Sequence, residues 1–515
     1  MTYRAHVVML VANDITNDSR VLKEAAVLAA AGLRVTLLGV STDERLSIDS
    51  MDGRAVIARL PGIFRHRDGR LSRRNRRRDW RLPLLGVSIP RELVARRALI
   101  DARRAELRLG VRPGPGRVFR LRLREAAFAA GRARGLLIRW QNRVFKFGWR
   151  AWDGVVSRTP WLVSWPAVVP QTYDYEEIFG PAIDRLAPDV VHAHDMHVIG
   201  VAVRAAARAR RAGRPLKVVY DAHEYVPGIA RYGGRTRRFI AAWAGHERDF
   251  ISAADRVVTV SPGIADRLER EHRLGRRPEV VLNTPDLPET VVRTDDIRSR
   301  IGLAAEIPLL VYSGGITPVR GIETAITALD RLPGVHLAVV AVPSPELPMV
   351  DRLRRLAEDA GVADRVHFLH PVGPREVTAF LSTADAGIIP MLRAPNHELA
   401  MPNKLFEYSL GGLPLLVSDM ASLREFVTRF GIGESFEAGN SQDFAAKAEL
   451  LLGRLQSYRD RLADPAFRQV AAWSGQADRL RTLYGELLGQ DLTSTTVARA
   501  CPDDVAVIED LVGAC

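Results

Sequence analysis

Residues 5–40 read AHVVMLVANDITNDSRVLKEAAVLAAAGLRVTLLGV, and this stretch indicates the fold class. AHVVMLVA is an apolar run, as expected of a strand that is buried on both faces. SRVLKEAAVLAAAGL follows with helical spacing and a stop at Gly32, and RVTLLGV is again typical of a strand. A strand, a helix and a second strand in this order predict a βαβ unit with parallel strands.

The same alternation recurs in two series along the chain. The first continues through DVVHAH, LKVVYDAHE, RVVTVS and EVVLN, with helical segments between them. The second begins at IPLLVYSGG, after the polar stretch TPDLPETVVRTDD. Continuous apolar strands that alternate with helices predict an α/β protein with two parallel sheets, each covered on both faces. Two such domains bind ligands at the carboxyl ends of their strands, in the cleft between them.

The predicted boundaries follow from these series and from composition. The first Rossmann-like domain is expected at 1–288, with a basic insertion at about 64–165, and the second at 296–455. A helical region at 460–489 is expected to return toward the first domain, and 490–515 is expected to be a loose tail.

Composition points to the cytosol. Apolar residues make up 47% of the chain, which suffices for sizeable cores. The two cysteines, Cys501 and Cys515, lie in the last fifteen residues, which argues against a disulfide scaffold or a cysteine metal site. The N-terminal residues lack the apolar core of a signal peptide, and no apolar run approaches the roughly 20 residues of a membrane span. We therefore expect a cytoplasmic protein.

The net charge of +14 is concentrated in one segment. Residues 64–150 hold 26 Lys and Arg against 6 Asp and Glu, so the remainder of the chain is net negative. Aromatic residues such as Phe119, Trp140 and Trp149 are interleaved with the arginines. This mixture suits an anionic membrane surface, which would make the protein peripheral on the inner face of the membrane. A solvated surface insertion is the plain alternative, and nucleic-acid binding is the least favoured one.

Two predicted helices begin with a cation. MPNKLFEYSLGG, residues 401–412, places Lys404 in the first turn of a helix, although the chain has only 5 Lys against 69 Arg. Arg320 lies in or next to the first turn of the helix after SGG, residues 313–315. A cation at a helix N-terminus is unfavourable unless an anion binds there, and a diphosphate would satisfy both ends. The alternative is that both side chains extend into solvent.

Glu407 follows Lys404 by three residues, so both face the same side of the helix. An acidic residue near a nucleotide commonly accepts hydrogen bonds from ribose hydroxyls. The alternative is an ion pair between Glu407 and Lys404 within the helix.

At these motifs the chain resembles retaining glycosyltransferases of the GT-B fold, family 4. The stretches that carry the resemblance are NDSRVLKEAAVLAAAGLRVTLLG, DVVHAHD, VVYDAHEY, VVTVSPGIADRL, VVLNTPD, SGGITPVRGIETAI and MPNKLFEYSLGGLPLLVSD. The resemblance covers most of the chain outside 64–165 and the tail, and it points to the family members that share PNKLFEY. It implies that the second domain holds a nucleotide-diphosphate sugar as donor substrate, that the first holds a carbohydrate or lipid-linked acceptor, and that no metal or other cofactor is needed.

The resemblance also assigns roles to individual residues. Glu407 matches the glutamate that holds the ribose, Arg320 the basic residue on the diphosphate, and His223 the histidine beside the transferred sugar. We predict His223, Arg320 and Lys404 as catalytic. The predicted donor-binding residues are Gly314, Gly315, Arg320, Asn403, Lys404, Leu405 and Glu407, and the predicted acceptor-binding residues are Asp18, Arg20, His194, Asp195 and Glu224. For the histidines, the alternative is a structural role in which the ring forms a hydrogen bond to a loop carbonyl.

The sequence departs from the family pattern at two places. The family often has two glutamates eight positions apart, but Leu399 stands eight before Glu407, and the nearest acid is Glu398. The second basic residue on the diphosphate would fall at Ile316, so Lys404 is expected to replace its charge. These departures leave two alternatives to a transferase of cell-envelope or exopolysaccharide glycans: a decayed GT-B scaffold protein at the membrane, or a GT-B sugar-nucleotide epimerase.

Overall fold

The computed structural model describes residues 4–16, 18–69, 165–231, 235–286, 296–373, 375–492 and 499–513, together with scattered positions between 97 and 130. Internal contacts divide the chain into two compact units. The first unit holds Met1–Ile63, Thr172–Arg235 and Ala242–Cys515, and the second holds Phe64–Gln171 and Thr236–Ala241. Both sheets and the candidate site described below lie in the first unit, so the account that follows concerns that unit.

The first sheet has the strand order β3-β4-β2-β1-β5-β6-β7-β8. Every neighbouring pair is parallel except β3 and β4, which are antiparallel. The order reverses between β1 and β5, which is where a doubly wound sheet opens a crevice for ligands. Its strands are β1 (His6–Leu10), β2 (Arg34–Val40), β3 (Ser47–Met51), β4 (Ala55–Leu60), β5 (Val190–His194), β6 (Lys217–Ala222), β7 (Arg256–Thr259) and β8 (Glu279–Val280).

The second sheet has the order β11-β10-β9-β12-β13-β14, and all of its pairs are parallel. Its order reverses at β9, so this sheet opens a second crevice at the end of β9. Its strands are β9 (Leu309–Gly315), β10 (His336–Val342), β11 (Val366–Leu369), β12 (Ala386–Ile389), β13 (Leu415–Ser418) and β14 (Gly433–Phe436).

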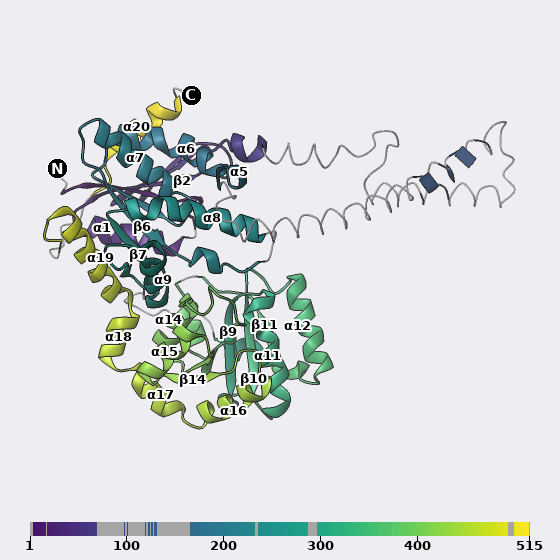
Figure 1. Ribbon diagram of the computed structural model, residues 1–515. Helices are drawn as coiled ribbons and strands as arrows, with labels where there is room; N and C mark the ends of the chain where they lie inside the picture. The colour runs from purple at the N-terminus through teal and green to yellow at the C-terminus, as the bar shows by residue number, and fades with distance from the viewer. Residues whose placement is uncertain are drawn as a thin grey trace. The chain divides into compact units, whose positions relative to one another are not determined.

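Helices flank each sheet, as Figure 1 shows. Those in the first half of the chain are α1 (Ser19–Ala30), α6 (Gln171–Leu186), α7 (Ile199–Arg211), η2 (Val226–Gly228), α8 (Arg237–Phe250), η3 (Ile251–Ala253) and α9 (Pro262–His272). Helix α5 (Trp165–Val168) belongs to the second unit. Those in the second half are α10 (Ile297–Ile301), η4 (Pro318–Arg320), α11 (Ile322–Ala328), η5 (Leu329–Arg331), α12 (Pro348–Asp359), η6 (Ala363–Arg365), α13 (Val377–Leu381), α14 (Asn403–Leu410), α15 (Ala421–Phe430), α16 (Ser441–Leu452), α17 (Leu455–Leu462), α18 (Pro465–Ala471), α19 (Trp473–Leu488) and α20 (Pro502–Gly513).

The central strands are buried along their whole length, because helices cover both faces. Every residue of β1, β5, β12 and β13 is buried. Helix α19 belongs to the core of the first sheet, since Trp473, Leu480 and Tyr484 pack in one cluster with Val7 and Val219. The prediction of two parallel sheets in an α/β fold is therefore confirmed. The boundaries given for the domains stay predictions.

The expectation of a loose C-terminal tail was wrong for residues 502–513, which form α20. Ile508 and Asp504 are both fully buried. The Asp504 carboxylate accepts hydrogen bonds from Arg34 and from the Thr36 hydroxyl on β2. This contact could not be read from local sequence patterns, because the partners are some 470 residues apart.

The basic segment 64–150 lies mostly outside the described residues, so its proposed membrane role stays a prediction. Across the part of the chain that the structure describes, no helix combines the length and the apolar character that a membrane span requires.

Candidate functional site

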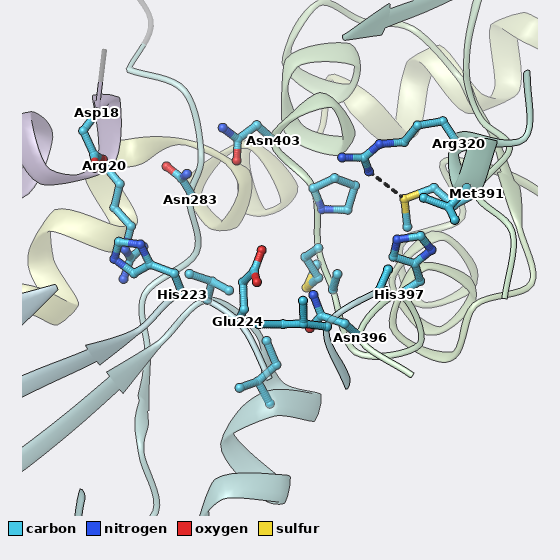
Figure 2. Close-up of a pocket in the computed structure, with 18 of the residues that line it drawn as sticks. Asp18, Arg20, His223, Glu224, Asn283, Arg320, Met391, Asn396, His397 and Asn403 are labelled. Atoms are coloured by element: carbon cyan, nitrogen blue, oxygen red, sulfur yellow. Dashed lines mark hydrogen bonds between the residues drawn. The ribbon is translucent and has the colours of Figure 1, made fainter. Parts of the chain in front are cut away.

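A cavity of about 610 Å³ is lined by residues of both sheet domains. This volume is within the range of small-molecule sites. Asp18, Arg20 and His223 contribute to it from the first domain, and Arg320 and His397 from the second. Figure 2 shows these two groups on opposite sides of the cavity, with the Glu224 carboxylate pointing into the space between them. The remaining lining residues are Asn13, Asp14, Ser19, Ile229, Ala230, Arg235, Val260, Ile264, Asn283, Val319, Met391, Asn396, Ala400, Met401, Pro402 and Asn403.

Two tyrosines hold the glycine-rich turn at the end of β9. The Ser313 backbone N–H donates to the Tyr408 hydroxyl at 2.7 Å, and the Tyr312 hydroxyl donates to the Gly315 carbonyl at 2.8 Å. Gly314 has φ +131°, a conformation that other residues rarely adopt. The turn at the crevice of the second sheet is therefore fixed by hydrogen bonds from both sides.

Lys404 reaches this turn from the first turn of α14. Its side chain is buried, and Nζ lies 3.7 Å from the centre of the Tyr312 ring. A Cβ atom on Gly314 would lie only 3.0 Å from Nζ, so the glycine makes room for the ammonium. Burial and the neighbouring Arg320 cation hold the pKa of Lys404 well below its usual value, although Glu407 acts in the opposite direction.

Arg320 ends the short helix η4, at the start of the turn into α11. Gly321 has φ +69°, and a Cβ there would lie 1.9 Å from the Pro390 carbonyl oxygen, so only glycine fits. The Arg320 guanidinium donates to the Met391 sulfur at 3.4 Å and lines the cavity, as Figure 2 shows. Within the described residues, no carboxylate forms an ion pair with Arg320 or Lys404 at 4.0 Å or less. The arrangement thus brings two cations together without an anionic partner.

Glu407 lies half-buried one turn along α14. The ion pair with Lys404 that the sequence left open does not form within 4.0 Å in the described structure. Burial raises the pKa of Glu407, while Lys404 and Lys23 of the first domain oppose that shift. The Lys23 ammonium donates to Asn283 at 3.1 Å and lies 4.7 Å from the centre of the Trp473 ring. Glu407 therefore faces cations from both domains.

Arg20, which lines the first-domain side of the cavity, belongs to a buried cluster of charged side chains. The Arg20 guanidinium makes two hydrogen bonds to Asp221, of 2.7 and 2.8 Å, and one to the Val281 carbonyl. It also lies 3.0 Å from the Glu24 carboxylate. The His223 ring contacts the same Asp221 carboxylate at 3.0 Å.

Among the described residues, this cluster also contains a possible set of metal ligands. Glu24, His192, His194 and Asp221 have ligand atoms within 4.8 Å of one another, and all four are buried. Arg20 already contacts both carboxylates, however, and supplies the positive charge that a metal would bring. A metal ion would have to displace this guanidinium, so the residues fit an ion pair better than a metal site.

The predicted acceptor residues divide into two groups. Asp18, Arg20 and Glu224 line the cavity. His194 is 1% exposed and packs against Asp221 and the His192 ring, so it does not reach the cavity. Asp195 pairs with His197 at 3.2 Å and also lies outside the lining. Arg20 uses its donors within the protein, so it has little left for an acceptor.

Of the predicted donor residues, only Arg320 and Asn403 line the cavity directly. Lys404, Gly314 and Gly315 are not among its lining residues; Lys404 lies against Gly314, and Gly315 belongs to the same turn. Leu405 is fully buried in the core of the second domain, so its side chain cannot contact a ligand.

The cavity also contains polar residues that the sequence did not single out, above all Asn283, Asn396 and His397. Glu398, the acid nearest to the missing family glutamate, bonds instead to Arg393 and to the Ala421 N–H at the start of α15. His397 lines the cavity in its place and bonds to the Leu392 carbonyl. The stretch HELAMPNK differs from the family's glycine-rich run, and that difference was the available signal.

Matches to known protein families fall on both sheet domains. Residues 293–467 match the sequence model described as "Glycosyl transferases group 1", and residues 146–287 match "Glycosyltransferase Family 4". The D-inositol 3-phosphate glycosyltransferase of Nocardia farcinica is 29% identical over 258 residues, which are 47% of this chain and 55% of that protein. The enzyme of the same name from Streptomyces avermitilis is 26% identical over 331 residues, or 60% of this chain and 64% of that protein. The chain thus spans less than two thirds of either relative.

Solved structures share the architecture. A sucrose-phosphate synthase from Thermosynechococcus elongatus superposes with a TM-score of 0.61 at 15% identity, over 94% of this chain and 99% of that one. The trehalose-6-phosphate synthase OtsA superposes with a TM-score of 0.54 at 12% identity, over 94% and 99%. At these identities the structural likeness shows the fold alone. That fold is GT-B. With the two sequence matches, the chain belongs to the family 4 glycosyltransferases, as its motifs predicted. Its place in the PNKLFEY group stays a prediction.

Proposed function

We propose that this protein transfers a sugar from a nucleotide-diphosphate sugar to an acceptor hydroxyl with retention of configuration. The observation that carries the proposal is the pair of cations Arg320 and Lys404, neither of which pairs with a carboxylate within 4.0 Å among the described residues. Two like charges near each other are unfavourable without an anion between them, and a diphosphate would reverse that cost. Glu407 and Asn403, one face of α14, are our candidates to bind the nucleoside.

The chemistry follows from the leaving group. Departure of a nucleoside diphosphate concentrates negative charge on its terminal phosphate. Fixed cations next to that phosphate stabilise the charge as it develops, without rearrangement during the reaction. Arg320 and Lys404 would serve this purpose, and we propose that transfer needs no divalent cation. Retention is carried over from the family, in which the acceptor hydroxyl arrives on the face that the leaving group vacates.

The acceptor would bind on the first-domain side, where Asp18, Glu224 and Asn283 line the cavity. Carboxylates and amides are suited to sugar hydroxyls, which donate and accept hydrogen bonds. We propose a carbohydrate or lipid-linked acceptor of the cell envelope, presented at the inner face of the membrane by the basic segment 64–150. The position of Glu398 outside the cavity favours the second candidate, a GT-B binding protein that has lost turnover.

The first test is calorimetry of nucleoside diphosphates, then of the parent nucleosides. Arg320→Ala or Lys404→Ala should weaken diphosphate binding by about 1.5–3 kcal/mol, the value of a charged hydrogen bond, and should leave nucleoside binding nearly unchanged. Glu407→Ala should weaken both ligands alike, because it acts on the ribose. Arg424→Ala is the matched control, since Arg424 is an exposed arginine on α15 outside the cavity.

Equal losses for nucleoside and diphosphate in the Arg320 and Lys404 variants would refute the diphosphate assignment. Turnover is tested separately with a panel of nucleotide sugars in the presence of a chelator, with the anomeric product followed by NMR. Donor consumption without any acceptor would indicate the epimerase, and tight binding without turnover the decayed binding protein.

A further inference from the structure

The buried carboxylate of Asp221 connects the ionic cluster to the cavity. Asp221 is the fifth residue of β6 and is fully buried. Arg20 of α1 holds both of its oxygens, at 2.7 and 2.8 Å. Burial would favour the neutral acid, but Arg20 and His223 outweigh it and keep the pKa of Asp221 well below its usual value. The carboxylate is therefore a fixed negative charge.

Arg20 is itself immobilised. Its Nη1 donates to the Val281 carbonyl at 2.7 Å, and its Nη2 lies 3.0 Å from the Glu24 carboxylate. The guanidinium thus links α1 to β6 and to the chain after β8. A carboxylate held in this way cannot turn toward a ligand, so its orientation is set before any substrate binds.

His223 is the residue through which this charge reaches the cavity. Its Nε2 lies 3.0 Å from Asp221 Oδ2, and the residue lines the cavity. Because Nε2 faces Asp221, Nδ1 is the nitrogen left for a ligand. The charged and titratable groups around the ring are Asp221 on β6, Asp195 after β5, His192 and His194 on β5, Arg20 and Glu24 on α1, and the adjacent Glu224.

These groups decide the charge of the ring. Burial lowers the pKa of His223, but Asp221, through charge and hydrogen bond, and Asp195 outweigh it and raise the pKa to about 9. At neutral pH His223 is then an imidazolium with a proton on each nitrogen.

We propose that Asp221 is a positioning residue for sugar transfer: clamped by Arg20, it orients His223 so that the ring presents its Nδ1–H to an oxygen of the bound donor substrate. This inference rests on the proposed function. A neutral histidine with an unprotonated Nδ1 could accept a proton and act as a base. The contact with Asp221 favours the protonated ring, so it disfavours that role. The positive charge of His223 would act from the side of the cavity opposite Arg320. Both cations would then stabilise the negative charge that develops on the bound donor substrate.

The test combines an NMR titration with pH–rate profiles. In the wild type, the His223 Cε1–H resonance, assigned by its loss in His223→Gln, should titrate above pH 8. In Asp221→Asn it should titrate at or below 6.5. At pH 7, Asp221→Asn should lower kcat at least tenfold and change the KM for the donor less than threefold. The alkaline limb of kcat should move to lower pH in this variant and disappear in His223→Gln.

Asp385→Asn is the matched control. Asp385 forms a comparable ion pair with Arg298, with an N–O distance of 2.6 Å, and it does not line the cavity. Its profile should resemble that of the wild type. If Asp221→Asn does not fold, Asp221→Glu replaces it: it keeps the charge, so His223 should still titrate above 8, while kcat falls because the ring is displaced.

A wild-type His223 that titrates near 6.5 would overturn the inference. So would a folded Asp221→Asn with unchanged titration and unchanged profile, or an Asp221→Glu with unchanged kcat. If no nucleotide sugar is turned over, the proposed function fails, whereas the titration still reports on the contact between Asp221 and His223.

Discussion

Gly314 shows how one residue can serve two requirements. Its φ of +131° is strained for any residue with a Cβ atom, and that atom would also meet the Lys404 ammonium at 3.0 Å. Gly315, its neighbour, has neither constraint, since nothing lies within 4 Å of its Cβ position. The two glycines look equivalent in the sequence but differ in what the fold asks of them.

Gly314→Ala should therefore lower the free energy of unfolding by about 1–3 kcal/mol, the usual cost of a strained backbone. Gly315→Ala should change it by less than about 0.5 kcal/mol, as for a substitution without contacts. Urea denaturation of the two variants without ligand makes the comparison. Equal losses would mean that the turn is not held in the conformation described here.

At the scale of elements, α14 and η4 place the two cations. Helix α14 begins at Asn403 after Pro402, and the turn at Gly321 directs Arg320 toward the cavity. The position of Lys404 near a helix N-terminus was readable from the sequence. Its contact with Tyr312 was not, because that contact depends on how α14 packs against β9.

Helix α20 provides the second element-scale prediction. Asp504→Ala should lower the free energy of unfolding by about 1–3 kcal/mol, because the Arg34 and Thr36 donors lose their acceptor. Hydrogen exchange should speed up within α20 in particular. Asp503→Ala is the matched control, since Asp503 is the exposed neighbour on the same helix. Similar losses in both variants would contradict the docking of α20 through Asp504.

At the scale of the whole molecule, the two sheet domains are joined by direct hydrogen bonds. The Tyr225 N–H donates to Asn396, the Asn396 N–H donates to the Gly228 carbonyl, and the Ser261 hydroxyl donates to the Leu399 carbonyl. The segment HELAMPNK and its surroundings thus contact the first domain, where the family carries a glycine-rich run. These contacts position Asn396 and His397 in the cavity.

The charge distribution leads to a prediction for the whole chain. Vesicles with anionic lipids should sediment the protein at low salt and release it as salt rises, because screening shortens the Debye length. Replacing Arg73, Arg74, Arg76, Arg77 and Arg78 by Gln should weaken this binding at least tenfold, since each basic residue contributes about 1 kcal/mol near an anionic surface.

The matched control removes five exposed arginines from the second domain: Arg352, Arg354, Arg355, Arg424 and Arg429. It should bind vesicles like the wild type. Any of three results would refute the membrane proposal. Neutral vesicles could bind the protein as well as anionic ones, both variants could lose the same vesicle affinity, or RNA at equal phosphate concentration could displace the vesicles completely.

The sequence alone determined the fold class and the segments that meet at the cavity. Alternating apolar strands and helices require buried parallel sheets, and parallel strands bring their carboxyl ends to one edge. Arg320 and Lys404 could be selected from local patterns, and Asp18, His223 and Glu224 from the family resemblance. The structure places Asp18, His223, Glu224 and Arg320 in the lining of one cavity. The prediction that Lys404 lies in the first turn of a helix was also correct, since α14 begins at Asn403.

Only the tertiary structure decided which polar side chains remain available to a ligand. Arg20 and Asp221 are 201 residues apart in sequence, yet they neutralise each other, and His194 is enclosed with them. Asp504 is matched with Arg34 in the same way. A charge is free or compensated according to neighbours that folding supplies from anywhere in the chain, and the local sequence around Arg20 or Arg320 does not contain those neighbours.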